Sequence, residues 1–149
     1  MVAAMNEDVP RIIPTALHEV TPDKIEAAWP ALEPMVAKFI DDSLHTVEDV
    51  RGWLLSGSMK LWIAGTRQGI EAIAVVEPLQ HTKGRCLVVW GCAAGPKTHS
   101  DRWLSHLDQI ERMGKEKYGC IKVRIEGRKG WARRLPNYRL AGYIMEKDL

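Results

Sequence analysis

The stretch MKLWIAGTRQGIEAIAVVEPLQHTKGRCLVVWGCA, residues 59–93, decides the fold class. It contains three runs rich in the aliphatic and β-branched residues that favour strands. Short turn segments separate them, Arg67-Gln68-Gly69 after the first and Lys83-Gly84 before the third. The three runs are 59–64, 70–77 and 85–93. Because connections this short join neighbouring antiparallel strands, the stretch predicts a three-stranded meander.

Downstream, a helix and a further strand follow. Ser100 is a predicted N-cap, and the helix is expected to end near Gly119. Apolar residues alternate with charged residues over 121–125, which predicts a strand. A helix between two strands permits a parallel crossover connection. A short basic helix at 130–135 and a last strand at 142–147 complete this half of the chain.

Upstream, the spacing predicts a strand at 12–20 and two helices. Thr21-Pro22 opens the first helix, which Pro30 and Pro34 are expected to kink or split. Thr46 begins the second with a capping-box pattern, and Gly57 ends it. The whole order predicts an α/β fold (α+β in the sense of a mixed sheet) with helices on both faces. We expect residues 1–149 to form one domain, with 1–10 flexible.

Composition excludes several classes of protein. The chain has 149 residues and no apolar run of the roughly 18 to 20 residues that spans a bilayer. Residues 1–10 have no signal-peptide pattern. The three cysteines lack CxxC spacing, which argues against a disulfide framework and a zinc site. Their apolar strand positions favour core packing over nucleophilic roles, and we expect a cytoplasmic protein without a metal.

Charge is unevenly distributed. Residues 1–50 hold ten acidic and three basic side chains, whereas residues 112–139 hold ten basic and two acidic ones. A basic half suggests a polyanionic partner, either nucleic acid or a phosphorylated cofactor. A solvated basic face is an equally good interpretation of charge alone. No RNA- or DNA-binding motif accompanies the charge, so nucleic acid is the less favoured partner.

The C-terminal segment Asn137-Tyr138-Arg139-Leu140-Ala141-Gly142-Tyr143 resembles the "lYeklGF" pattern of the GNAT (GCN5-related N-acetyltransferase) superfamily. Residues 118–123 resemble the family's passage from its third helix into its fifth strand, and the predicted element order is similar along nearly the whole chain. Residues 128–131 and the strand around Trp62 suggest kinship with small GNAT-like proteins of bacteriophages. The loop at 90–100 departs from the family's Gln/Arg-x-x-Gly-x-Gly/Ala spacing.

The resemblance implies that acetyl-CoA is the cofactor. Its pantetheine arm would pair with backbone near 89–92, where two strands diverge. Its pyrophosphate would lie at the N-terminus of the helix that Ser100 begins, where free N–H groups favour anions. The alternative is a loop of small residues that only turns the chain. The predicted cofactor-binding residues are Val89, Trp90, Gly91, Cys92, Ala93, Gly95, Lys97, Ser100, Arg102 and Arg128.

The resemblance also implies catalytic roles. Tyr138 corresponds to the family's general acid toward the coenzyme A sulfur, and Glu77, at the predicted end of a strand, is the first candidate for the general base. Glu126, His81 and His99 are weaker candidates for the base. The alternatives are a tyrosine packed below the last strand and a carboxylate in water. Three tryptophans under the first two helices are predicted to wall the acceptor cleft: Trp29, Trp53 and Trp62.

Two functions remain open from the sequence. The first is acetyl-CoA-dependent N-acyl transfer to a primary amine of a small molecule, peptide or protein. The second is a binding module with the same fold and a decayed cofactor site, which docks on a partner protein, a host factor if the chain is viral. An unpaired sheet edge near the C-terminus would also permit a homodimer.

Overall fold

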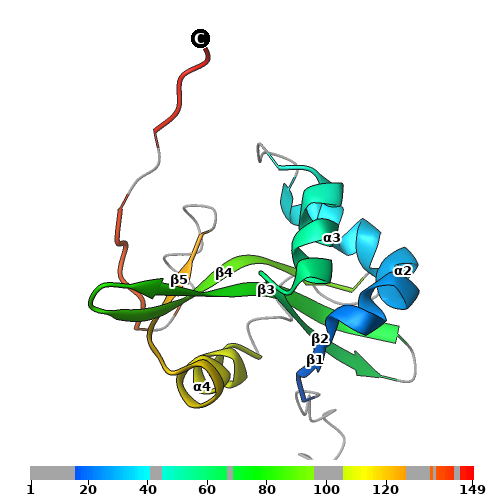
Figure 1. Cartoon of the computed structure of the whole chain (residues 1–149), viewed down its shortest axis with the longest axis horizontal. Helices are drawn as coiled ribbons and strands as arrows, with labels where there is room; N and C mark the ends of the chain where they lie inside the picture. The colour runs from blue at the N-terminus through cyan, green and yellow to red at the C-terminus, as the bar shows by residue number, and fades with distance from the viewer. Residues whose placement is uncertain are drawn as a thin grey trace, which may run out of the picture.

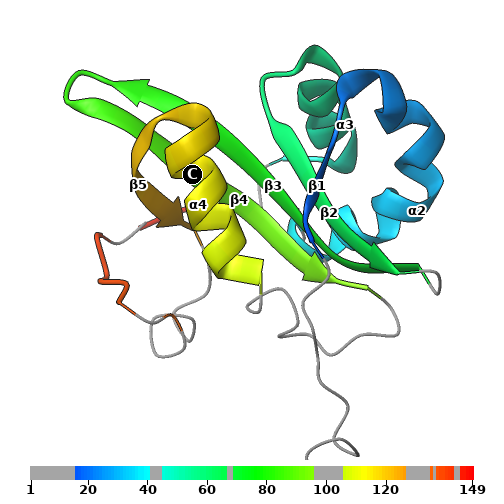
Figure 2. The same cartoon turned by 90° about the horizontal axis from the view of Figure 1, so that it is seen from below.

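A computed structural model describes the chain at residues 16–40, 45–66, 69–95, 106–126, 135, 137–142 and 145–149. The fold is a mixed five-stranded sheet of order β1-β2-β3-β4-β5 with helices on both faces (Figures 1 and 2), as the sequence predicts. The elements are β1 (His18–Val20), α2 (Pro22–Ile40), α3 (Val47–Ser56), β2 (Lys60–Thr66), β3 (Gly69–His81), β4 (Gly84–Ala94), α4 (Leu107–Tyr118) and β5 (Cys120–Ile125).

The predicted meander is confirmed. β2 pairs antiparallel with β3, and β3 pairs antiparallel with β4. The pairing of β3 with β4 contains an irregularity, because Val75 faces Gly91 while Val76 faces Val89, so Trp90 is an extra residue in β4. This is a β-bulge, which bends the strand and turns successive side chains to one face.

The predicted crossover is also confirmed. β4 and β5 are parallel, and α4 lies between them in the sequence. Gly119 ends α4 in a left-handed conformation (φ 67°), which glycine adopts without steric cost. Gly119 is therefore the one residue between the end of α4 and the start of β5.

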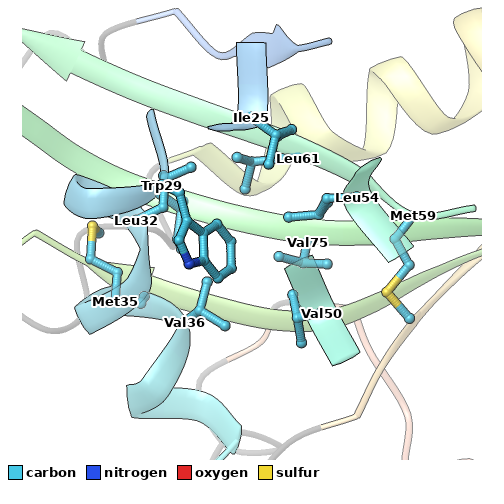
Figure 3. Packing of buried hydrophobic residues seen from close by; sticks show 12 residues of the cluster. Ile25, Trp29, Leu32, Met35, Val36, Val50, Leu54, Met59, Leu61 and Val75 are labelled. Carbon is cyan, nitrogen blue, oxygen red and sulfur yellow. The ribbon is translucent and has the colours of Figure 1, made fainter. Parts of the chain in front are cut away.

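Two cores hold the helices on opposite faces of the sheet. α2 and α3 cover one face, on which Ile25, Leu32 and Val36 are fully buried (Figure 3). α4 covers the other face, on which Ile110 packs against the sheet with Val89. Figure 1 shows α2 and α3 on one side of the strands and α4 on the other. Each face of the sheet is thus fixed by its own helices.

α2 corrects one expectation, because it is not split. It is one helix of 19 residues with Pro30 and Pro34 inside it. Both prolines are exposed, so the carbonyl groups that lose their helical partners, those of Glu26 and Pro30, belong to the side that water reaches. The opposite side carries Trp29 and other buried residues, whose packing holds the helix together.

The ends of α3 match the prediction. Thr46 Oγ1 accepts a hydrogen bond from the N–H of Asp49 (3.1 Å), and Asp49 Oδ2 accepts one from the N–H of Thr46 (2.8 Å). Gly57 follows the last turn with φ 81°. This capping box and glycine stop define the helix from both ends.

Four predicted boundaries differ or lie outside the described residues. α4 begins at Leu107 with His106 as its N-cap, whereas the predicted cap Ser100 is not described. β1 is shorter than the predicted 12–20, of which residues 12–15 are not described. The expected final strand at 142–147 is not formed by its described residues, 142 and 145–147. The end of the chain runs away from the sheet (Figure 1), and Met145 is 92% exposed, so these residues have no ladder to join. Most of the predicted helix at 130–135 lies outside the described residues.

Gly91 allows α2 to approach β4. A Cβ atom at position 91 would overlap the ring of Phe39 from α2. We expect Gly91→Ala to lower the free energy of unfolding by about 1–3 kcal/mol through overpacking. Urea unfolding measures this, and the double variant Gly91→Ala/Phe39→Leu should recover part of the loss. An unchanged free energy of unfolding for Gly91→Ala would show that this contact is not tight.

Candidate functional site

A gap opens between β4 and β5. The last paired residues are Val89 and Ile125, and the N–H of Glu126 donates to the Val89 carbonyl (3.4 Å). β4 continues to Ala94 with β3 as its partner, while β5 ends. Figure 1 shows β4 continuing past the end of β5. The edge of β4 that faces away from β3 therefore has no strand beside it from Trp90 onward in the described part of the chain.

The backbone of β4 offers hydrogen-bonding groups to this gap. The N–H of Gly95 donates to the Glu71 carbonyl on β3 (2.8 Å). Because backbone groups of successive strand residues point to opposite edges, those of Ala94 and Cys92 point away from β3. Lys38 Nζ, from the end of α2, donates to the Ala94 carbonyl (3.3 Å). A ligand with amide groups could extend the ladder here as a strand would.

A cavity of about 330 Å³ lies beside the bulge on the face covered by α2 and α3. Trp90 joins the cavity to the gap, because its backbone borders the gap and its indole lines the cavity. Trp90 Nε1–H donates to Glu77 Oε2 (2.8 Å), which holds the carboxylate at the cavity wall. The lining residues are His45, Trp53, Ser58, Met59, Glu77 and Trp90.

Aromatic rings form one side of the cavity. The His45 ring meets Trp53 edge-on, with centroids 5.0 Å apart, and meets Trp90 edge-on at 6.3 Å. Trp53 is held by the end of α3, where its carbonyl accepts hydrogen bonds from Ser56 Oγ, Ser58 Oγ and the N–H of Met59 (3.0, 3.3 and 3.2 Å). These bonds fix the turn that carries three of the lining residues.

Tyr138 lies on the opposite face of the sheet, at the gap. It packs against a small cluster of Ala72, Leu107 and Leu135, which Cys92 of β4 and Ile125 of β5 also contact. Its hydroxyl donates to Glu111 Oε1 on α4 (3.4 Å). Burial, and secondarily the charge of Glu111, raise the pKa of Tyr138 above its ordinary value. The phenol therefore keeps its proton at neutral pH and is a donor.

The cysteines do not form a nucleophilic site. Cys86 and Cys120 are buried, and burial raises the pKa of Cys92 far above its ordinary value. Because the thiolate is the nucleophile, such a thiol is inert at neutral pH. The expectation that the cysteines are core residues holds for Cys86 and Cys120, whereas Cys92 is half-buried beside the gap.

A buried polar chain ties the start of α4 to β3. His106 is 1% exposed, and its Nε2 lies 3.7 Å from Glu71 Oε2 on β3. Gln109 contacts His106 Nδ1 (3.2 Å) and accepts a hydrogen bond from the N–H of Leu17 (3.1 Å). The residue before β1, the strand β3 and the start of α4 are thus linked by polar contacts at the beginning of α4.

Solved structures share this architecture. One is a possible acetyltransferase from Clostridium difficile 630, with a TM-score of 0.66, 11% identity, and coverage of 92% of this chain and 99% of that chain. Another is a ribosomal-protein-alanine N-acetyltransferase from Brucella melitensis biovar Abortus 2308, with a TM-score of 0.64, 8% identity, and coverage of 89% and 100%. The fold is that of the GNAT acetyltransferases.

A third likeness is a predicted acetyltransferase with acetyl-CoA from Clostridium acetobutylicum, with a TM-score of 0.61, 13% identity, and coverage of 89% of this chain and 95% of that chain. No family model and no curated protein matches the sequence. At these identities the likenesses establish the GNAT fold alone, which confirms the fold predicted from the sequence. Kinship with bacteriophage proteins gains no support and stays a prediction.

Within the GNAT fold, the predicted cofactor residues of β4 come together. They line the bulge and the gap edge, and Gly95 follows directly. The others lie outside the described residues: Lys97, Ser100, Arg102 and Arg128. Glu77 lies at the cavity and Tyr138 across the sheet from it. Of the other candidate bases, His81 is exposed at the far end of β3, Glu126 is exposed after β5, and His99 is not described.

Two of the three tryptophans predicted to wall the cleft do not do so. Trp29 is 6% exposed in the core under α2, and Trp62 faces α4 on the opposite side of the sheet. A strand alternates its side chains between faces, so Trp62 cannot share a wall with Trp53. Trp90 lines the cavity beside Trp53 instead, because strand alternation from Val89 directs it to the face under α2 and α3.

Sequence reasoning missed several residues of the site. His45 directly precedes the capping box of α3, and its ring contacts Trp53 of that helix. The short spacing between the two residues was the signal in the sequence that could have indicated this contact. Ser58 and Met59 follow the glycine stop of the same helix. Glu111, the partner of Tyr138, had no local signal, because the pair is joined across the fold.

No helix in the described part of the chain is long and apolar enough to cross a membrane. Among the same residues, no group of three or more His, Cys, Asp or Glu side chains is arranged to hold a metal ion.

The environment of Tyr138 makes stability pH-dependent. Its folded pKa is raised, so its contribution to stability is full below the unfolded pKa of about 10 and is lost as pH rises through the folded value. We expect Tyr138→Phe to lose less free energy of unfolding than the parent between about pH 8 and about pH 11. Urea unfolding at both pH values measures this. Equal losses would mean that the folded phenol titrates normally.

Proposed function

We propose that the chain is an acetyl-CoA-dependent N-acetyltransferase that transfers an acetyl group to a primary amine. The observation that carries this is the gap between β4 and β5, with a carboxylate at a cavity on one face and a proton-bearing tyrosine on the other. An acyl transfer needs a proton acceptor for the amine and a proton donor for the leaving group. In this proposal the thioester binds in the gap, between the proton acceptor on one face and the proton donor on the other.

Acetyl-CoA fits the residues present along β4. Peptide-like amides in its pantetheine arm would pair with the backbone groups of Cys92 and with the N–H of Ala94, which point away from β3. Gly91, Ala93 and Ala94 keep the side chains small on this part of the strand. When bound, acetyl-CoA supplies the acetyl group as a thioester. One likeness, the Clostridium acetobutylicum protein, was solved with acetyl-CoA. We propose that Gly95, Lys97, Ser100, Arg102 and Arg128 complete this site.

Glu77 acts as the base in this proposal. It takes one proton from the bound ammonium and passes it to water. The neutral nitrogen then attacks the thioester carbonyl carbon from the cavity side, and the new C–N bond replaces the C–S bond. The indole of Trp90 keeps the carboxylate at the wall where the amine approaches.

Tyr138 acts as the acid from the opposite face. It donates its proton to the departing sulfur and is reprotonated by the second proton that the nitrogen loses. Glu111 positions the hydroxyl, and the surrounding burial keeps the phenol protonated until the transfer. Each proton lost by the amine is thereby accounted for, with one net proton released to solvent.

The binding-module alternative has no observation of its own in its favour. A partner protein and a homodimer remain predictions. The cytoplasm, where acetyl-CoA is made and thiols stay reduced, is the proposed location. Acetyl-CoA-dependent release of free thiol in the presence of primary amines tests the proposal, and a chain that neither binds acetyl-CoA nor releases thiol would overturn it.

Tyr138→Phe is the sharpest variant for the proposed chemistry. We expect kcat to fall about 10- to 100-fold. This is at or below the low end of the usual rate contribution of acid catalysis, because a thiolate is a good leaving group. The affinity for acetyl-CoA should stay nearly unchanged. Steady-state kinetics and calorimetric titration measure the two quantities. Tyr118→Phe is the matched control, because Tyr118 is also part-buried and bonded to a carboxylate, Glu19 (3.3 Å), but does not join the cluster at the gap. Equal kcat values for Tyr138→Phe and the parent would remove Tyr138 from the mechanism.

A further inference from the structure

We propose that the acceptor is a small amine with one positive charge and a flat apolar body, such as an arylalkylamine, and that it binds in the cavity that Trp53, Trp90 and Glu77 line. The inference rests on the proposed function in taking the bound amine to be the acceptor. It goes further because it selects one class among small molecules, peptides and proteins. Three properties of the cavity carry it: its charge, its rings and its size.

The charge of the cavity suits a single ammonium group. Glu77 is the carboxylate among the described lining residues. Its Oε2 accepts the Trp90 indole N–H, and we propose that the same carboxylate pairs with the ammonium. A buried ammonium needs such a partner, because an unpaired charge in a cavity is costly. Among the described residues of the lining, no second carboxylate would meet the further charges of a polyamine.

The rings of the cavity suit a flat apolar body. Trp53 and Trp90 present large aromatic surfaces, and Met59 adds a polarisable sulfur that favours aromatic contacts. Indole faces also attract a nearby cation, so the two tryptophans would stabilise the ammonium group of the ligand as well as its ring. His45 stands edge-on to both indoles and keeps them apart. Ser58 is a neutral hydroxyl in the lining and can serve a substituent on the ring.

The size of the cavity suits a small molecule. Its volume of about 330 Å³ lies at the low end of ligand pockets, which run from about 300 to about 1,000 Å³. An arylalkylamine places its nitrogen a short chain away from its ring. With the ring in the cavity against the tryptophans and the nitrogen at Glu77, the nitrogen lies next to Trp90, which borders the gap. The acceptor is thus delivered to the place where the proposed thioester would lie.

Binding of three probes to the free protein tests this inference without any acetyl transfer. The probes are 2-phenylethylamine, its neutral analogue 2-phenylethanol, and spermidine, a polycation without a ring. Calorimetric or NMR titration gives each Kd. We expect 2-phenylethylamine to bind at least about 10-fold more tightly than either of the others, which corresponds to one charge-assisted contact plus ring burial.

Variants assign that binding to the cavity. Glu77→Gln should reduce the affinity for 2-phenylethylamine to that for 2-phenylethanol, and Trp53→Leu should weaken both. Glu33→Gln, an exposed carboxylate on the outer side of α2, is the matched control and should change neither. Because the comparison of the three probes needs only the parent protein, a variant that unfolds does not remove the test.

The outcomes separate this inference from the proposed function. Tight binding of 2-phenylethylamine that depends on Glu77, without thiol release from acetyl-CoA, supports the cavity assignment and counts against the transferase. Thiol release with spermidine or a lysine peptide, but no preference for 2-phenylethylamine, supports the transferase and overturns this inference. Equal affinities for 2-phenylethylamine and 2-phenylethanol also overturn it, because the charge of Glu77 would then select nothing.

Discussion

The extra residue in β4 is the feature on which the rest of the site depends. Because Trp90 is inserted opposite Val75 and Val76, β4 bends at this point, and its pairing with β5 ends at the residue before it. Trp90 lies on the face under α2 and α3, where its indole donates to Glu77. Gly91 lies under Phe39, so α2 can lie close over the bent strand. The insertion thus lies where the gap begins, beside the cavity wall and under α2.

The two faces of the sheet then have different roles. The face under α2 and α3 holds a carboxylate and aromatic rings, whereas the face under α4 holds Tyr138 in an apolar cluster with Glu111 as its partner. A reaction centred in the gap is open to proton removal from one face and proton donation from the other. Low-dielectric surroundings on the tyrosine side favour the neutral phenol. In the proposed reaction, Glu77 and Tyr138 would act from opposite faces of the sheet.

Local patterns predicted the fold well. The meander, the capping box of α3 and the glycine after α4 are each decided within a few residues, so the sequence alone identifies them. The expectation that Pro30 and Pro34 could split α2 was wrong. Tertiary packing of the buried side of the helix outweighs two lost hydrogen bonds. The site was predicted only in part. Glu77, Trp90 and Tyr138 were named, but the bulge that relates them depends on pairing with β3, and the Tyr138–Glu111 contact joins segments far apart in the chain.

The proposed function depends on binding of the amide-bearing arm of acetyl-CoA to the edge of β4 that faces away from β3. Amide hydrogen exchange followed by NMR, with and without acetyl-CoA, tests this directly. Cys92 and Ala94, whose backbone groups point away from β3, should become protected when acetyl-CoA is added, while Gly95, already bonded to Glu71, should change little. Binding of acetyl-CoA without protection at Cys92 and Ala94, or no binding at all, would contradict the account.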